Sequence, residues 1–184
     1  MRYVKETIRY GLLLVVLCFM QCRESVTTTT KQRESHYDKG QAVFYGAYYA
    51  EEGVEQNVVA LDMYSKGLSL DSAGYMVGSG VNLYISDIFL PEQDSFLVET
   101  TYVSDTTGNV FTFLPGVNYE GQISGAYVLE VTDGALSSAE VFPEGSFNVV
   151  SKEDSVFIEF LLKNEAGKKY AADFKGELPY YDGR

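Results

Sequence analysis

The residues that could perform nucleophilic or metal chemistry are few in this chain. It has one histidine, His36, and two cysteines, Cys18 and Cys22, so no cysteine follows position 22. A Ser-His-Asp mechanism needs a histidine held by a folded scaffold, and a cysteine nucleophile or a Cys/His zinc site needs thiols in the folded body. The sequence therefore predicts no enzyme of these classes, no metal site and no cofactor.

Carboxylates leave one catalytic alternative open. Glycoside hydrolysis needs two carboxyl groups about 5 to 10 Å apart, in environments that separate their pKa values. Glu130 and Glu159 interrupt apolar stretches and are the best candidates, but the alternating pattern places each on the solvent side of its strand. Acidic loops at Asp87, Glu92–Asp94 and Glu153–Asp154 could suit calcium. Because the EF-hand spacing is absent and Asp is common in turns, we predict no calcium site there.

Aromatic residues are the more informative excess, since the chain has 15 Tyr and 11 Phe but no Trp. Tyr48 and Tyr49 are expected at a strand end, and Tyr180 and Tyr181 in a C-terminal tail, where rings can be exposed. An exposed tyrosine offers a flat face for stacking and a hydroxyl for hydrogen bonds. We predict that these four tyrosines bind a glycan or a protein partner.

The N-terminal segment has the pattern of an export signal. Basic residues within Met1–Gly11 precede the apolar run Leu12–Met20. At about 1.5 Å per residue this run would cover roughly half of a ~30 Å hydrocarbon core, so a spanning helix is not expected. We predict a cleaved signal peptide over residues 1–21.

Cys22 follows this segment and resembles the lipid-modified first residue of bacterial lipoproteins, although Gln21 stands where they usually have a small residue. The resemblance implies a lipid anchor on Cys22 and a place in the cell envelope, at the outer membrane. The polar stretch Arg23–Lys39 cannot bury enough apolar surface to offset its ordering entropy. We therefore expect residues 22–39 to be a flexible tether, with His36 solvated inside it.

The charge balance restricts the partners. The chain carries a formal net charge of −12, and loss of residues 1–21 would remove three basic side chains and one acidic one. A strongly acidic chain is unsuited to nucleic acid, because that binding depends on neutralising phosphates. It is equally unsuited to electrostatic attachment to anionic lipid, so membrane contact is expected through the lipid anchor alone.

Residues 40–184 are expected to form one all-β domain. Apolar residues alternate with polar ones in short stretches separated by Gly, Asp, Asn and Pro. The expected strands are 42–50, 57–64, 81–89, 96–103, 110–114, 126–132, 139–142, 147–150, 156–163 and 169–178, the last two joined by a turn at 164–167. About ten short strands without a long helix predict an antiparallel β-sandwich, with a calycin-like β-barrel as the alternative.

Several stretches carry a resemblance across this body. Phe44–Tyr49, Gly145–Val149, Gly167–Tyr170 and Phe174–Leu178 resemble segments of uncharacterised surface lipoproteins of Bacteroidota. The resemblance implies an all-β envelope domain and brings no functional residue with it.

Taken together, these patterns predict a non-enzymatic binding or assembly module, anchored in the envelope, that contacts a polysaccharide or another envelope protein. One alternative is a β-barrel that carries a small apolar ligand. A glycoside hydrolase that uses two carboxylates is the other.

Overall fold

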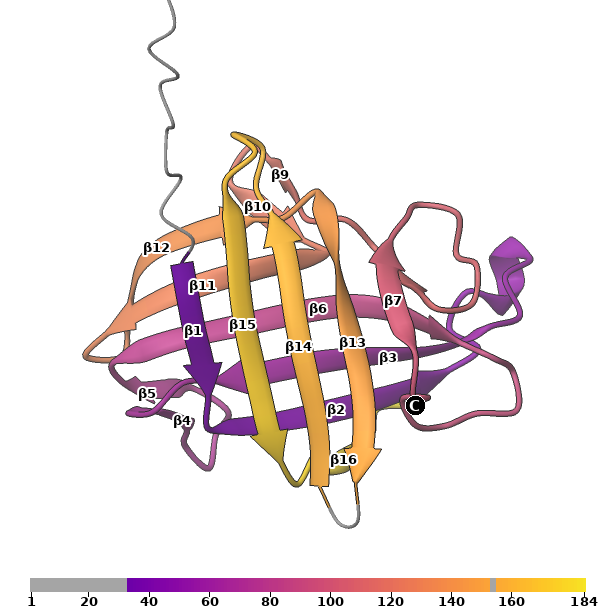
Figure 1. The fold of residues 1–184 in the computed structure, drawn as a ribbon, viewed down its shortest axis with the longest axis horizontal. Coiled ribbons are helices and arrows are strands. Elements are labelled where there is room, and N and C mark those ends of the chain that lie inside the picture. Colours follow the sequence, from indigo (N-terminus) through magenta and orange to yellow (C-terminus); the bar gives the residue numbers. More distant parts are fainter. Residues whose placement is uncertain (1–32, 153–154) are drawn as a thin grey trace, which may run out of the picture. The chain divides into compact units, whose positions relative to one another are not determined.

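A computed structural model of the chain describes residues 33–152 and 155–184. These residues form one 12-stranded sheet, two two-stranded sheets and one 3-10 turn, η1, at Ala50–Glu52 (Figure 1). The all-β class predicted from the sequence is confirmed. The predicted signal peptide, residues 1–21, and the predicted anchor, Cys22, lie outside the described residues.

The strands in chain order are β1 (Arg33–Tyr37), β2 (Lys39–Gly46), β3 (Asn57–Tyr64), β4 (Leu68–Leu70), β5 (Met76–Gly78), β6 (Gly80–Leu90), β7 (Thr101–Ser104), β8 (Thr112–Phe113), β9 (Val117–Tyr119), β10 (Gln122–Ser124), β11 (Ala126–Thr132), β12 (Ala135–Val141), β13 (Glu144–Lys152), β14 (Ser155–Lys163), β15 (Lys169–Gly176) and β16 (Tyr180–Asp182). β3 and β11 have the bounds expected from the sequence. The sequence did not predict β1, β4, β5, β9, β10 or β16.

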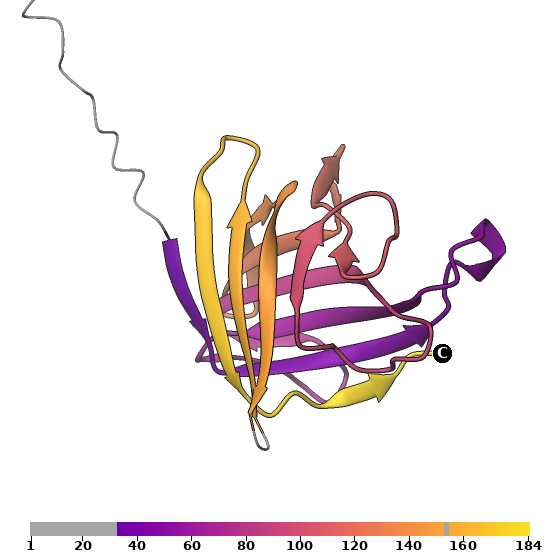
Figure 2. The ribbon, with the colours of Figure 1, turned by 45° about the vertical axis from the view of Figure 1, so that its right-hand side comes forward.

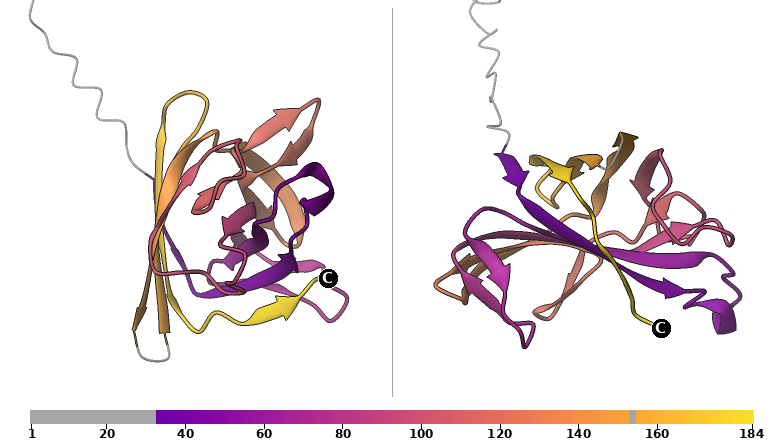
Figure 3. Two further views of the ribbon diagram at one scale, coloured as in Figure 1. Left: turned by 90° about the vertical axis from the view of Figure 1, so that its right-hand side faces the viewer. Right: turned by 90° about the horizontal axis from the view of Figure 1, so that it is seen from below.

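The large sheet folds over on itself into two layers that run crosswise (Figure 1). β16, β2, β3 and β6 form one layer, and β13, β14, β15 and β1 form the other. β8 pairs with β6 and β7 pairs with β13, so this short parallel pair links the layers. Figure 3 (left) shows β14 and β15 edge-on as one upright layer. Strands that cross between two packed layers in this way are typical of orthogonal β-packing.

The sheet is mixed, whereas the sequence predicted antiparallel pairing throughout. β1 pairs in parallel with β15, and β16 pairs in parallel with β2. Both pairs join segments from distant parts of the chain, and parallel pairs usually need a longer connection than a hairpin provides. Figure 2 shows β16 running alongside β2 in the same direction.

The predicted tether, residues 22–39, is too long, because its last part includes the strand β1. The tether was predicted to reach Lys39, but the chain enters the sheet at Arg33. Tyr37 is fully buried, and its hydroxyl lies within hydrogen-bond distance of the Tyr170 hydroxyl. Burial of this one large aromatic side chain and pairing with the edge of β15 stabilise a segment whose composition alone indicates a flexible chain.

The alternating pattern places apolar side chains between the layers as predicted. On β3, Val59, Leu61 and Met63 are fully buried in the main core. The other face of β3 is covered too, because Tyr64 packs with Leu68 and Val131 in a second cluster beneath the β4–β5 hairpin. Both faces of this strand are therefore covered.

Aromatic rings fill the space between the two layers. The rings of Tyr102 and Phe147 stack with centroids 4.7 Å apart, and Phe147 contacts Phe160 at 5.7 Å. All three side chains are buried, as are Phe113 and Phe142. These rings pack against one another in the main core between the two layers.

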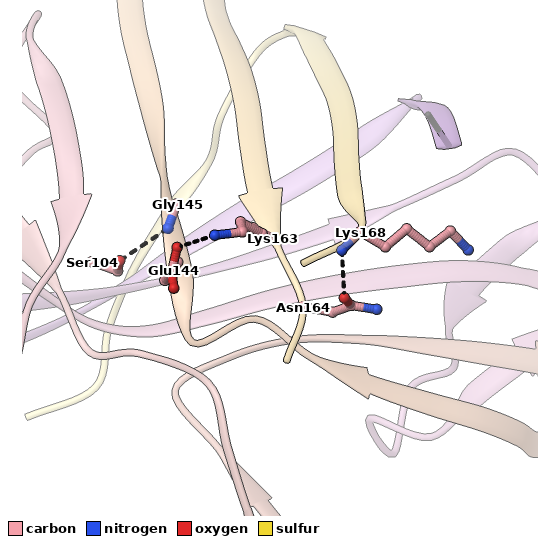
Figure 4. Close-up of polar contacts among 6 residues, drawn as sticks. All are labelled: Ser104, Glu144, Gly145, Lys163, Asn164 and Lys168. Atoms are coloured by element: carbon pink, nitrogen blue, oxygen red, sulfur yellow. Dashed lines mark hydrogen bonds and ion pairs between the residues drawn. The ribbon is translucent and has the colours of Figure 1, made fainter. Parts of the chain in front are cut away.

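The hairpin of β14 and β15 forms through the predicted turn. The Gly167 N–H donates to the Asn164 carbonyl, and the Asn164 side chain accepts from the Lys168 N–H at 2.8 Å (Figure 4). On the preceding strand, Gly145 donates its N–H to Ser104 Oγ at 3.0 Å (Figure 4). A Cβ at Gly145 would lie 2.7 Å from the Leu162 Cα, so only glycine allows these backbones to approach so closely.

Candidate functional site

A hollow of about 310 Å³ lies on the outer face of the β2–β3–β6 layer. Its walls are mainly tyrosines, and we call it the tyrosine hollow. It is lined by Tyr45, Tyr48, Tyr49, Ala60, Tyr84, Ser86 and Asp87. Its volume is at the lower end of the range of small-ligand sites, and its walls combine aromatic rings with hydroxyl groups and one carboxylate.

The end of β2 brings the first three tyrosines together. Gly46 adopts a left-handed φ of 64°, and the β2–β3 register shifts between Phe44 and Gly46. The chain therefore leaves the sheet sharply after Tyr45 and turns into η1, so Tyr48 and Tyr49 lie beside the strand instead of continuing it.

The tyrosine rings contact one another edge to face. Tyr48 lies 5.0 Å from Tyr49 and 6.1 Å from Tyr45 between ring centroids, and Tyr49 continues to Phe89 at 6.0 Å. Tyr48 is nevertheless 64% exposed. Edge-to-face contacts hold a ring in place at the rim while leaving a face open to a ligand.

Asp87 supplies the charge of the hollow from the middle of β6. It has a left-handed φ of 50°, which is uncommon for a residue other than glycine and is best tolerated by Asp and Asn. Its Oδ1 accepts a 3.0 Å hydrogen bond from the Tyr49 hydroxyl. Oδ2 has no hydrogen-bond partner within the part of the chain that the structure describes. Strained residues of this kind cluster at binding sites.

Burial and the neighbouring Asp87 carboxylate raise the pKa of Tyr49 to about 12. The hydroxyl is protonated near neutral pH and therefore acts as a donor to Asp87. The paired groups thus present a fixed carboxylate oxygen to the hollow. Such an oxygen accepts hydrogen bonds from the hydroxyl groups of a ligand.

Asp62 is a second carboxylate on the same outer face. It lies on β3 opposite Tyr84 on β6, and it accepts hydrogen bonds from Tyr64, from Asn82 at 2.5 Å and from Gln41 at 3.3 Å. Burial raises the pKa of this carboxyl, and the three donors only partly oppose that effect. Its oxygens are occupied by the protein, so we assign Asp62 a structural role beside the tyrosine hollow.

The structure separates the four predicted tyrosines into two pairs. Tyr48 and Tyr49 lie in the tyrosine hollow, just after β2, which ends at Gly46 and not at Ala50 as expected. Tyr180 and Tyr181 were expected in a tail, but they form β16, on the edge of β2 opposite β3. The Tyr180 hydroxyl accepts a 2.9 Å hydrogen bond from the Leu97 N–H, and burial raises its pKa to about 12. Tyr181 is 54% exposed.

Tyr45 and Tyr84 also line the tyrosine hollow but were not among the tyrosines predicted to bind a ligand. Asp87 was considered only for calcium. Tyr45 and Tyr84 belong to strands whose alternation was recognised, and both lie on the outer face. The sequence signal that could have identified them is an aromatic residue at an outward position of a strand. The alternating pattern could not show that their two strands, β2 and β6, are both neighbours of β3.

The other predicted candidates lie apart from this hollow. His36 lies in β1, not in a linker, and its Nδ1 is 2.7 Å from an Asp173 oxygen on the exposed face of β15. Glu159 is exposed on β14, and Glu130 on β11 accepts a hydrogen bond from Ser138. The loop Glu153–Asp154 lies outside the described residues.

Within residues 33–152 and 155–184, no three His, Cys, Asp or Glu side chains come together in a group that could hold a metal ion. No helix in these ranges has the length and apolar character needed to cross a membrane.

Comparisons with family models, with curated proteins and with solved structures gave no match to this chain. The resemblance to Bacteroidota lipoproteins and the function therefore remain predictions. The fold and the hollow define an all-β domain with an aromatic, acidic hollow on the outside of one layer.

Proposed function

We propose that this protein is a non-enzymatic binding module that holds an uncharged glycan in the tyrosine hollow. The observation that carries the proposal is the exposed ring of Tyr48, braced by Tyr45 and Tyr49 beside the Asp87 carboxylate. A sugar ring has an apolar face that packs on a tyrosine ring, and its hydroxyls donate to a carboxylate.

Size and charge favour a glycan over a protein partner. A stable protein interface buries about 800 Å² per partner, whereas small ligands occupy hollows from about 300 Å³ upward. The tyrosine hollow, at about 310 Å³, matches the second class. The net charge of −12 and the carboxylate in the hollow disfavour acidic polymers, which leaves uncharged sugars.

Affinity electrophoresis tests this proposal directly. The full chain would be run in gels that contain xylan, laminarin, galactomannan or starch, and in gels that contain polygalacturonate as the anionic comparison. We expect retardation by at least one neutral polysaccharide and none by polygalacturonate. Tyr48→Ala should weaken that binding about two- to tenfold, since one aromatic contact contributes roughly 0.5–1.5 kcal/mol.

Tyr119→Ala is the matched control, because Tyr119 is 72% exposed on β9 and does not line the tyrosine hollow. Both variants remove an exposed ring, so neither should change the fold. Equal retardation of both variants would contradict the assignment of the site. The absence of retardation in every neutral gel would contradict the glycan proposal itself.

We further propose that a lipid on Cys22 holds the module in the outer membrane. This proposal rests on the basic start, the apolar run Leu12–Met20 and the position of Cys22 directly after Gln21. Cys22→Ala should move the protein from the membrane fraction to the soluble fraction of the cell. Cys18→Ala is the control, since Cys18 lies inside the predicted leader and should leave the protein in the membrane fraction. Retention of Cys22→Ala in the membrane would contradict the anchor.

A further inference from the structure

A second hollow, of about 530 Å³, lies at the same end of β2 as the tyrosine hollow. We call it the β16 hollow. Its walls come from β2, from the loop that contains Phe96 and from β16, and they include Tyr45, Asn57, Phe96, Tyr180, Tyr181 and Asp182. It is thus another aromatic hollow with a carboxylate, and β16 and the Phe96 loop contribute to it but not to the tyrosine hollow.

Tyr45 lines both hollows. Its ring contacts Tyr48 on one side at 6.1 Å between centroids. On the other side β16 passes close by, since a Cβ on Gly183 would lie 2.7 Å from a Tyr45 ring carbon. The two hollows are therefore adjacent, with the side chain of Tyr45 between them.

The β16 hollow has the same chemical character as the tyrosine hollow. Phe96 is 62% exposed and packs edge to face on Tyr180 at 4.7 Å. Tyr181 follows on β16 and is also largely exposed. Braced rings at the rim therefore occur in both hollows, as they should where sugar faces are to pack.

Its polar groups also suit hydroxyls better than ions. The Arg184 guanidinium donates from Nε and Nη2 to the two oxygens of Asp182, at 2.9 and 2.7 Å, so each charge neutralises the other. These hydrogen bonds hold the pKa of Asp182 at about 2, so the carboxylate stays ionised and keeps lone pairs for further donors. The Asn57 amide is fixed by the carbonyls of Glu92 and Asp94.

We propose that the tyrosine hollow and the β16 hollow are consecutive subsites of one site, which binds an internal stretch of an extended polysaccharide across Tyr45. This inference rests on the proposed function and adds the form of the ligand. A single sugar would occupy one hollow, whereas a chain would occupy both. Occupation of the second subsite by the same molecule costs little extra binding entropy, so affinity should rise steeply with chain length.

Calorimetric titration of the full chain with oligosaccharide ladders tests the inference. The probes are cello-, xylo-, laminari- and malto-oligosaccharides of two to eight units. For the series that binds, we expect the longest members to bind at least tenfold more tightly than the disaccharide, with a plateau once both hollows are filled.

Two variants separate the subsites. Tyr181→Ala should weaken the longest oligosaccharides more than the disaccharide and so remove most of the gain with length, whereas Tyr48→Ala should weaken every member of the series. Tyr119→Ala should match the unaltered protein. Equal affinity at all lengths, with no effect of Tyr181→Ala, would overturn the extended site and leave the proposed function intact. No binding of any oligosaccharide or neutral polysaccharide would overturn both.

Discussion

Tyr49 donates a 3.0 Å hydrogen bond to Asp87, a residue 38 positions further along the chain. The bond joins the turn that follows β2 to a residue of β6. β2 and β6 are not paired with each other, because β3 lies between them. It fixes the position of the one carboxylate in the tyrosine hollow. Because Asp87 has a left-handed backbone, both the side chain and the backbone at this position should resist substitution.

Substitutions of Asp87 should separate these two requirements. Asp87→Asn keeps an acceptor for Tyr49 and tolerates the left-handed φ, so stability should fall by less than about 1 kcal/mol. Asp87→Gly relieves the backbone strain but loses the hydrogen bond. Asp87→Ala loses the hydrogen bond and also adds strain, so its free energy of unfolding should fall by about 1–3 kcal/mol in total. Urea unfolding should rank the variants Asn, Gly, Ala in decreasing stability. If Ala were as stable as Gly, the backbone strain would be refuted.

Tyr180→Phe should destabilise the domain, whereas Tyr181→Phe should not. The Tyr180 hydroxyl is the acceptor for the half-buried Leu97 N–H, so its removal leaves that donor without a partner, at a cost of about 1 kcal/mol. Tyr181 is exposed, and loss of its hydroxyl should change the free energy of unfolding by less than about 0.5 kcal/mol. Thermal unfolding of both variants measures the difference, and equal midpoints would mean that β16 is not docked through Tyr180.

Tyr37→Ala and His36→Ala test whether β1 belongs to the folded domain. Tyr37 is fully buried, so its truncation should cost about 3–5 kcal/mol. His36 is exposed, and its side chain forms a surface hydrogen bond with Asp173, so its loss should cost less than about 1 kcal/mol. A small effect of Tyr37→Ala in chemical denaturation would restore the view of this segment as a tether.

Gly145→Ala should be strongly destabilising, because the new Cβ meets the backbone of β14 at 2.7–2.8 Å. Neither strand can move without breaking the β13–β14 pairing, so we expect a loss of about 2 kcal/mol or more. Gly176→Ala is the control, since a Cβ there meets only Phe174 ring carbons at 3.4 Å or beyond. Circular dichroism melts of the two variants should differ clearly, and a mild effect at Gly145 would contradict the close approach.

Asp62 should make the domain less stable as pH rises. Burial raises its pKa above the unfolded value of 3.8, so the folded state holds the proton more tightly than the unfolded state. The stability contributed by this tighter proton binding is fully present below pH 3.8 and is lost as pH rises through the pKa of the folded state. Asp62→Asn removes the titration, so the stability of the unaltered protein relative to Asp62→Asn should decline from acid toward neutral pH. A constant difference in urea unfolding between pH 3.5 and 7 would rule this out.

The alternation along Asn57–Tyr64 shows what could be predicted locally. A strand alternates its side chains between two faces, so Val59, Leu61 and Met63 had to share one face in any fold that uses this strand. The turn at 164–167 was predictable for a similar reason, because Asn and Gly favour the turn conformation whatever surrounds them. These elements were identified correctly without knowledge of their neighbours.

Pairing between distant strands was not predictable in this way. The composition of Arg33–Tyr37 indicates a flexible chain, yet the open edge of β15 and the buried Tyr170 make it a strand. Tyr180 and Tyr181 likewise form a strand only because the edge of β2 is available to them. Both outcomes depend on surfaces created by the rest of the domain.

The sequence alone therefore determined the all-β class, the main core faces and the aromatic excess. The tertiary structure decided the site: it joined Tyr48 and Tyr49 to Tyr84 and Asp87, and it placed the β16 hollow on the other side of Tyr45. The physical reason is the range of the interactions. Side-chain alternation and turn preference act between residues a few positions apart, whereas strand order depends on packing the whole chain around one core.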